Sequence, residues 1–515
     1  MSPSRRPGSS ASRAVRFQLS ALLVAVAGWL ATPANASAHG GLKSSDPAPG
    51  DTVRSVLTRI RLDFSEAPEM AFTSVQLRGP SGSLIDTGKP VFSGPLTLVL
   101  SFPGVSAPGT YTVIWRTAGK DGHPVRGRFT FAIAPRGDAP VPAAGTTDAV
   151  PAPFPTAGMA PMEMHHDSSA LPSGGPFDAQ STGYAVIRWF QFATLVSLLG
   201  AFAFQYLVLG FLRRKQHPDS PMLAVARRRA AEIAQWAAVA LALLAVVRLL
   251  AQSLAMHGGA DVMNLRMMGP MIGQTTWGAG WLLQLFGSAL VFAGLRFASR
   301  NSRRGWAIAA AGALAVAFSP GLSGHAASTP NISGLAVAAD ALHVIGAGGW
   351  LGSLLFVVIV GVPAALKLES EQQGPAVADL FNSFSPTALL FAGITATTGV
   401  FAAWLHLRSV TALWQTDYGA TLLVKLTILS VVAGTGAYNW LRVKPALGKL
   451  EGAARIRRSA TFELAVGLLV LAVTAVLVAT PTAVDEEMMR GTDASIEAQL
   501  PGPSPVDTTA AGIER

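Results

Sequence analysis

The segment Ser319–Gly352 reads SPGLSGHAASTPNISGLAVAADALHVIGAGGWLG and carries three titratable side chains into an apolar stretch. It predicts a short polar loop that holds His325, followed by a long apolar helix that begins around Asp340 and His343. Residues three apart share one face of a helix, so this carboxylate and imidazole converge on one point. Burying a charge in a membrane span costs about 2.5 to 3.5 kcal/mol, so such groups usually line a polar path. A purely structural alternative is open: Asp340 caps the helix, and His343 is a side chain with its hydrogen bonds satisfied at the membrane interface.

The composition indicates a membrane protein. Of the 515 residues, 50% are hydrophobic and only 13% are charged, which is too apolar for a soluble globular chain. The net charge of +10 does not predict a nucleic-acid partner, because the Lys and Arg residues cluster in short loops between apolar runs. The chain has no cysteine, so thiolate metal sites are excluded. The donors left for a soft or borderline metal are 9 His and 13 Met, helped by carboxylates.

The first 38 residues predict a secretory signal peptide. Basic residues including Arg5 and Arg6 precede an apolar run, and Ala36-Ser37-Ala38 forms a small-residue cleavage site. Cleavage there would leave His39 as the first residue, offering its α-amine and its imidazole to one metal ion. The alternative is an uncleaved anchor with His39 as an ordinary loop residue.

Residues 39–135 predict a small antiparallel β-sandwich, which stands outside the membrane because it follows the signal. Apolar residues alternate with polar ones in several short runs, such as Ile60, Leu62 and Phe64, and turn residues separate the runs. In an extended segment, Asp121 and His123 point the same way. Together with His39 they give a nitrogen-rich set suited to Cu(II). A plain Asp-Gly-His-Pro turn is the alternative.

Residues 136–180 are rich in Pro, Ala, Gly and Ser, which predicts a flexible linker. The linker contains a methionine and histidine cluster. Thioethers suit Cu(I) and imidazoles suit either oxidation state, so the cluster is a candidate copper site. An accident of composition is an equal alternative. The cluster consists of Met159, Met162, Met164, His165 and His166.

Residues 181–482 predict an all-α membrane domain of eight spans, each an apolar run near the 20 residues that a bilayer requires. The loops after the first, third and seventh spans are strongly basic. By the positive-inside rule these loops are cytoplasmic, which leaves the sandwich and the tail at 483–515 outside. The tail has too little apolar residue to fold. The predicted spans are 186–212, 231–256, 278–297, 306–321, 338–363, 387–407, 420–441 and 461–480.

In this topology, nitrogen and thioether donors gather on the outer side of the membrane domain, which predicts a path for a metal ion. Interface residues of a loose loop are the alternative. Lys425 and Glu463 also lie inside spans, and the favoured interpretation is that they pair with each other across neighbouring helices. The candidate path consists of His257, His325, Asp340, His343, His406, Met263, Met267 and Met268.

Two successive parts of the chain resemble two known protein families. The stretch HGGLKSSDPAPG at 39–50, and Asp121-Gly-His123 with Gly127 and Phe129, resemble the two signatures of the CopC copper-binding family. The resemblance to CopC implies that His39, Asp121 and His123 are the Cu(II) ligands of an Ig-like sandwich. A second, methionine-rich Cu(I) site of some CopC members is not expected, because only Met70 lies in the middle of this domain. The later segments resemble CopD over about 186–480, through Ser323-Gly-His325-Ala, Asp340-Ala-Leu-His343, Trp350-Leu-Gly352, Tyr418-Gly419 and Lys425.

The resemblance implies copper uptake or copper resistance at the inner membrane, with Cu(II) in the outer domain and Cu(I) or Cu(II) in the bundle. We therefore predict a copper transporter, not an enzyme, whose partners are copper ions, the lipid membrane and candidate periplasmic copper carriers. The sequence contains neither a GxxxxGK[ST] loop nor a DKTG motif, which argues against ATP-driven pumping. Two alternatives are open: a haem- or copper-containing membrane redox protein using paired histidines, and a copper sensor or chaperone without transport. Direction and oligomeric state do not follow from the sequence.

Overall fold

The structure is a computed structural model of the chain. It describes residues 42–64, 67–119, 122, 124–135, 177, 180–215, 220–257, 259, 262–298, 303–329, 331–407, 409–439, 441 and 450–483. The predicted signal peptide, the Cu(II) ligands His39, Asp121 and His123, the Met159–His166 cluster and the predicted tail after Ala483 lie outside the described residues.

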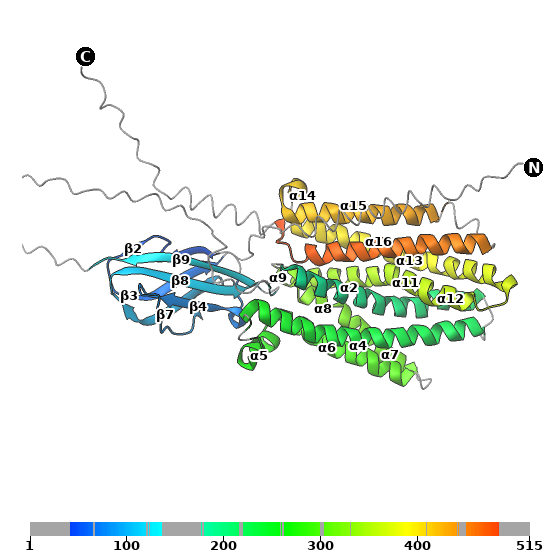
Figure 1. The fold of residues 1–515 in the computed structure, drawn as a ribbon, viewed down its shortest axis with the longest axis horizontal. Coiled ribbons are helices and arrows are strands. Elements are labelled where there is room, and N and C mark those ends of the chain that lie inside the picture. The colour runs from blue at the N-terminus through cyan, green and yellow to red at the C-terminus, as the bar shows by residue number, and fades with distance from the viewer. Residues whose placement is uncertain are drawn as a thin grey trace, which may run out of the picture. The chain divides into compact units, whose positions relative to one another are not determined.

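The N-terminal domain is a β-sandwich, as predicted (Figure 1). One sheet has the strand order β1-β3-β7-β6 and the other has the order β2-β9-β8-β4-β5. Most neighbouring strands are antiparallel, but β2 runs parallel to β9. The strands are β1 (Leu42–Asp46), β2 (Thr52–Val53), β3 (Leu57–Phe64), β4 (Ser74–Arg78), β5 (Leu84–Ile85), β6 (Val91–Phe92), β7 (Thr97–Val105), β8 (Gly109–Ala118) and β9 (Pro124–Ile133), with a short 3-10 helix η1 (Met70–Phe72) between β3 and β4.

Period-two alternation builds the core of the sandwich. Successive side chains of a strand point to opposite faces, so Ile60, Leu62 and Phe64 of β3 enter the core while Arg59 and Arg61 face out. Within the second sheet, Tyr111 of β8 stacks on its cross-strand partner Phe131 of β9, and its hydroxyl donates to the Ala107 carbonyl at 2.9 Å. Burial of the alternating residues therefore drives this domain to fold.

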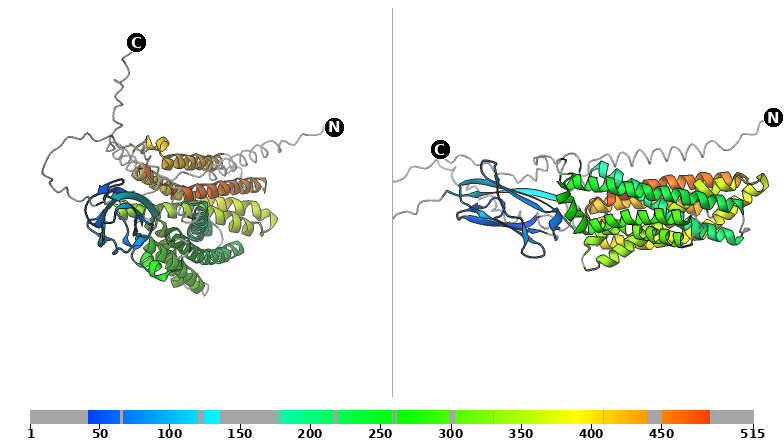
Figure 2. Two further views of the ribbon diagram at one scale, coloured as in Figure 1. Left: turned by 60° about the vertical axis from the view of Figure 1, so that its left-hand side comes forward. Right: turned by 90° about the horizontal axis from the view of Figure 1, so that it is seen from below.

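The C-terminal domain is a helical bundle, seen from three directions in Figures 1 and 2. Among the described residues, eight helices are long and apolar enough to cross a membrane, which confirms the predicted number. The larger helices are α2 (Thr182–Ala203), α3 (Leu209–Lys215), α4 (Pro221–His257), α5 (Leu265–Gly273), α6 (Thr276–Ala298), α7 (Arg303–Ala317), α10 (Ser333–Ala347), α13 (Ser370–Leu407), α15 (Asp417–Tyr438) and α16 (Leu450–Leu477). The shorter ones are α8 (Ser319–Leu322), α9 (His325–Ser328), α11 (Ser353–Phe356), α12 (Val362–Ala365) and α14 (Ala412–Gln415), with π-helical turns η2 (Phe204–Val208), η4 (Gly348–Gly352) and η5 (Val357–Gly361).

Several helices extend well beyond the predicted spans. The prediction started the sixth span at 387, but α13 begins at Ser370 and continues through Pro375 and Pro386. Its 38 residues reach about 57 Å at 1.5 Å per residue, well beyond the roughly 30 Å hydrocarbon core. The apolar window therefore located the span and missed the polar extension of the helix.

The segment around His325 also differs from the prediction. His325 begins the short helix α9 and does not lie in an open loop. The next helix, α10, starts at Ser333, so Asp340 and His343 lie about two turns inside it. The start of α10 was not predicted, because the hydropathy of the sequence rises only after Ser333 and Gly334.

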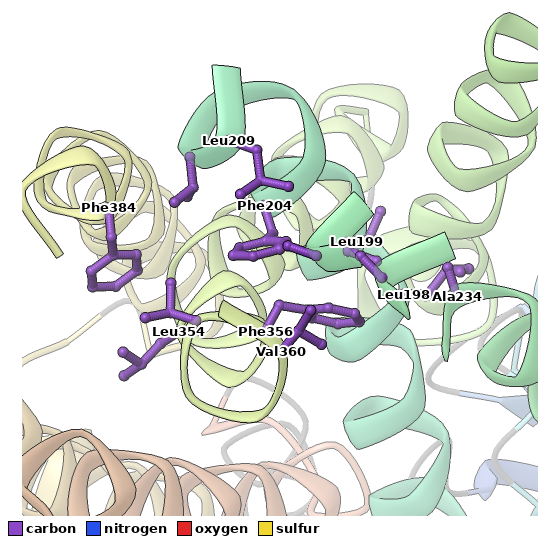
Figure 3. Packing of buried hydrophobic residues seen from close by; sticks show 14 of the residues in the cluster. Leu198, Leu199, Phe204, Leu209, Ala234, Leu354, Phe356, Val360 and Phe384 are labelled. Carbon is purple, nitrogen blue, oxygen red and sulfur yellow. The ribbon is translucent and has the colours of Figure 1, made fainter. Parts of the chain in front are cut away.

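Close glycine contacts hold the centre of the bundle together. A Cβ on Gly200 of α2 would overlap the Gly352 backbone, so the two backbones touch where only glycine fits. One turn later Phe204 lies 5.9 Å from Phe356, and Figure 3 shows these rings with Leu199, Leu209 and Val360 in one apolar cluster. These pairs fix α2 parallel to the α10–α12 segment.

Candidate functional site

Four of the predicted residues meet at one end of the bundle, at the junction of α9, α10, α13 and α15. The rings of His325 and His406 lie 6.0 Å apart, and the ring of His406 lies 5.9 Å from that of Tyr418. Asp340 interacts electrostatically with His325 and with Lys425 of α15. We call His325, Asp340, His343, His406, Tyr418 and Lys425 the polar cluster.

Asp340 approaches α8 closely because a glycine faces it. A Cβ on Gly321 would lie 3.1 Å from Oδ2 of Asp340, which is tighter than most side-chain contacts. Lys425 is the cationic neighbour of Asp340, yet among the described residues these two form no ion pair within 4.0 Å. The Asp340 carboxylate therefore lies near a positive charge, but its oxygen atoms are not held in an ion pair with Lys425.

His343 is oriented by α13. Its Nδ1 lies 3.0 Å from Oγ1 of Thr398. The Thr398 hydroxyl has a single proton, which it donates to the Ile394 carbonyl at 2.7 Å, so it accepts from His343. Nδ1 is then the protonated nitrogen, and the lone pair of the neutral ring lies on Nε2. Metal-binding histidines are commonly fixed in this way by a partner on the other ring nitrogen.

The polar cluster extends from the end of the bundle toward its middle. His406 and Tyr418 lie at helix ends, on α13 and α15. Asp340, His343 and Lys425 lie about two turns or more along their helices, some 10 Å deeper. The histidines, Asp340 and Lys425 are half-buried, so the cluster retains access for a ligand. The arrangement suits a hydrophilic ion that moves inward between apolar helices.

The described residues contain no group of three His, Asp or Glu side chains close enough to hold a metal ion together. Instead, the polar cluster offers successive partial sets: two imidazoles at the rim, then a carboxylate and an imidazole farther in. Partial coordination suits passage better than storage, because a transported ion has to leave each position again.

The other predicted path residues lie on α4 and α5. His257 ends α4, where its Nδ1 lies 3.3 Å from Oγ of Ser253. Met268 is buried in an apolar cluster with Met256, Met271, Trp277 and Trp281, whereas Met263 is 68% exposed and Met267 is 39% exposed. The buried sulfur atoms therefore act in packing, and Met263 and Met267 remain accessible.

The roles of Thr398, which contacts the polar cluster, and of Lys425, which belongs to it, were not predicted from the sequence. Thr398 was missed, because nothing in an apolar span distinguishes it from its neighbours Thr395 and Thr397. Lys425 was expected to pair with Glu463, and that prediction is wrong. Glu463 accepts a hydrogen bond from Asn439, while Lys425 faces Asp340 and His343.

In the sandwich, the start of β1 and the end of β8 lie at the same end of the domain. Leu42 pairs with Phe64, the last residue of β3. The ring of Phe64 lies 5.3 Å from that of Trp115 in β8, and the nearby Glu69 amide donates to the Ala118 carbonyl at 2.8 Å. His39 precedes β1 in the sequence, and Asp121 and His123 fall between β8 and β9, whose ends Ala118 and Pro124 are paired.

Three family models match successive parts of the chain. The CopC domain matches residues 42–134, the N-terminal domain of copper resistance protein D-like proteins matches 178–335, and copper resistance protein D matches 378–477. Together they cover the sandwich and most of the bundle.

Curated relatives match the whole chain or one of its parts. The copper transport protein CutJ of Bacillus subtilis (strain 168) is 23% identical over 457 residues, which is 87% of this chain and 75% of that protein. Protein YobA of Escherichia coli (strain K12) is 32% identical over 127 residues, covering 24% of this chain and 98% of YobA. Copper resistance protein D of Pseudomonas syringae pv. tomato is 28% identical over 250 residues, 44% of this chain and 76% of that protein. The chain belongs to the CopC/CopD family of copper resistance and copper transport proteins, with the CopC domain fused ahead of the membrane domain.

Proposed function

We propose that this chain captures Cu(II) with its sandwich and passes copper ions inward across the cytoplasmic membrane through the polar cluster. The observation that carries the proposal is the convergence of His325, His406, Asp340 and His343 at one end of the bundle. Two imidazoles, a carboxylate and a third imidazole in succession match the ligand preferences of copper. Packing alone gives no reason to place four such groups together.

The capture step uses His39, Asp121 and His123 as the Cu(II) ligands. The fold supports this assignment, because the strand that follows His39 begins at the same end of the sandwich where β8 and β9 are joined. Residues far apart in the sequence can thus supply one site. The methionine and histidine cluster at 159–166 is a further candidate carrier of copper between the two domains.

The charge distribution of the loops supports an outer location for the polar cluster. The opposite end of the bundle carries Arg213, Arg214 and Arg227, and basic ends face the cytoplasm. Copper released from the sandwich would therefore meet His325 and His406 before it meets Asp340 and His343. Uptake is the direction that this order favours.

Copper flux into liposomes that contain the purified chain tests the proposal. We expect His406→Ala to reduce the initial rate at least several-fold, because it removes one imidazole of the rim pair. His257→Ala is the matched control, since His257 lies on α4, outside the polar cluster, and we expect it to retain most of the rate. Equal rates for the wild type and His406→Ala would refute the route. Loss of flux only in His257→Ala would place the path along α4 and α5.

A further inference from the structure

A pocket of about 400 Å³ lies where α3 ends and α4 begins. Gln205, Tyr206, Gly210, Arg213, Arg214 and Arg227 line it. The pocket is at the opposite end of the bundle from the polar cluster, because α2 runs parallel to the α10–α12 segment through the Phe204–Phe356 contact. It therefore cannot belong to the proposed copper entrance.

The described side chains give the pocket a positive charge. Three guanidinium groups line it, and in the part of the chain that the structure describes no carboxylate lies within 4.0 Å of any of them. The neighbouring Arg228 differs, because it pairs with Glu232 at 3.0 Å. Guanidinium groups that converge without a carboxylate are typical of sites for phosphate or another oxyanion.

Two buried polar atoms in the pocket have no hydrogen-bond partner. Gln205 is 8% exposed and its Oε1 accepts no hydrogen bond, and the buried Nε of Arg227 donates none. Nearly all buried polar groups in proteins are satisfied, so each such atom indicates a missing partner. Arg227 requires an acceptor and Gln205 requires a donor. A ligand with a phosphate oxygen next to a hydroxyl group supplies both.

The position of the pocket matches the headgroup layer of a bilayer. The continuous helix Thr182–Arg214 has 33 residues, about 50 Å, so its end extends beyond a hydrocarbon core of about 30 Å. Tyr206 packs edge-on against Trp306 at 5.8 Å, and both residue types are enriched at the membrane interface. The π-helical turn η2 (Phe204–Val208) carries both Gln205 and Tyr206, and such turns are frequent at binding sites.

We propose that this pocket binds a phosphate ester that carries a neighbouring hydroxyl group, the chemistry offered by the glycerol phosphate headgroup of an anionic phospholipid. The arginines bind the phosphate oxygens, with Arg227 donating through Nε, and the hydroxyl donates to Oε1 of Gln205. A soluble phosphate shares the first part of this chemistry, and the experiment distinguishes the two sources.

The test measures ligand binding to the purified full chain by native mass spectrometry and by the shift in its thermal unfolding midpoint. The probes are phosphatidylglycerol, phosphatidylcholine and inorganic phosphate. We expect phosphatidylglycerol to bind and to raise the midpoint more than phosphatidylcholine does. Arg227→Gln should weaken phosphatidylglycerol binding about tenfold, through the loss of a charge-assisted hydrogen bond. Arg229→Gln removes the same charge from an exposed position outside the pocket lining and should leave binding unchanged.

A second variant keeps the test decisive if Arg227→Gln folds poorly. A Cβ on Gly210 meets no atom within 4 Å, so the backbone accepts a side chain there, and Gly210→Leu should narrow the pocket and also abolish the preference for phosphatidylglycerol. Stabilisation by inorganic phosphate alone, lost in both variants, would support the pocket and identify a soluble anion as its ligand. Equal phosphatidylglycerol binding by the wild type, Arg227→Gln and Gly210→Leu would overturn the proposal.

Discussion

Single residues in this chain are placed by partners that the sequence does not reveal. Asp340 and His343 were recognisable as a pair because they lie one turn apart in an apolar helix. Thr398 was not recognisable, since its role depends on the contact between α10 and α13. The polar cluster therefore combines local pattern, which a sequence shows, with helix packing, which it does not.

Removing the hydroxyl of Thr398 tests whether the orientation of His343 matters for copper movement. Thr398→Val keeps the shape and loses the acceptor for Nδ1, and losing such a partner typically weakens metal binding about 10- to 100-fold. We expect a clear drop in copper flux into liposomes. Thr397→Val is the matched control, because Thr397 is exposed and bonds only to the Gly393 carbonyl. An unchanged flux in Thr398→Val would make the His343–Thr398 contact purely structural.

Asp63 in the sandwich predicts a measurable pH dependence of stability. Burial raises the pKa of Asp63, but hydrogen bonds from Thr97, Arg61 and Ser44 outweigh this effect and hold the pKa below 3.8. Because the folded-state pKa is depressed, the stabilisation is complete above the unfolded pKa and disappears as the pH falls through the folded one.

The corresponding variant is Asp63→Asn. We expect it to destabilise the sandwich by about 1 to 2 kcal/mol at pH 7, and the difference from the wild type should shrink below about pH 4. Denaturant titrations of the full chain, followed by the far-ultraviolet signal of the strands, measure the difference. Asp86→Asn, at an exposed position, serves as the control. A difference that stays constant down to pH 2 would contradict the assignment.

At the scale of elements, the apolar windows identified every span but not the length of the helices. The extension of α13 back to Ser370 carries Glu371, Gln372 and Gln373, which lower the hydropathy of this part. The contact of α2 with the π-helical turn η4 depends on Gly200 and Gly352, and glycines in apolar spans do not by themselves indicate which helices touch. Hydropathy alone therefore does not predict which helices pack together.

Enlarging Gly200 tests the central helix contact. In Gly200→Leu the new side chain would clash with the Gly352 backbone, and overpacking of this kind costs about 1 to 3 kcal/mol or more. We expect a lower yield of folded protein and a lower unfolding midpoint in detergent. Gly393→Leu should behave like the wild type, because a Cβ at that position meets nothing within 4 Å. Equal loss of stability in both variants would mean that any leucine is harmful in these helices.

At the scale of the whole molecule, two family domains follow each other along the chain. The proposed copper route requires the sandwich and the polar cluster to lie on the same, outer side of the membrane. The sandwich and the number of spans could be predicted, because alternation and hydropathy are local properties of the sequence. The sequence could not predict that His257 lies outside the polar cluster, because this depends on which helix ends meet.

The topology is testable because the chain contains no cysteine. A single cysteine introduced at Asn331, an exposed position between α9 and α10, should react with a membrane-impermeant maleimide from outside the cell. A cysteine at Arg214, an exposed position at the end of α3, should react only after the membrane is opened. The reverse pattern would place the polar cluster in the cytoplasm and reverse the proposed direction of copper movement.

The most direct test of the central claim is the number of copper ions that the purified full chain binds at equilibrium. The polar cluster predicts weakly bound copper in the membrane domain, in addition to the more tightly bound copper of the sandwich. The double variant His325→Ala and His406→Ala should lose that additional copper while keeping the copper of the sandwich. If the double variant binds as many copper ions as the wild type, with the same affinities, the polar cluster is not a copper site and the proposed route is wrong.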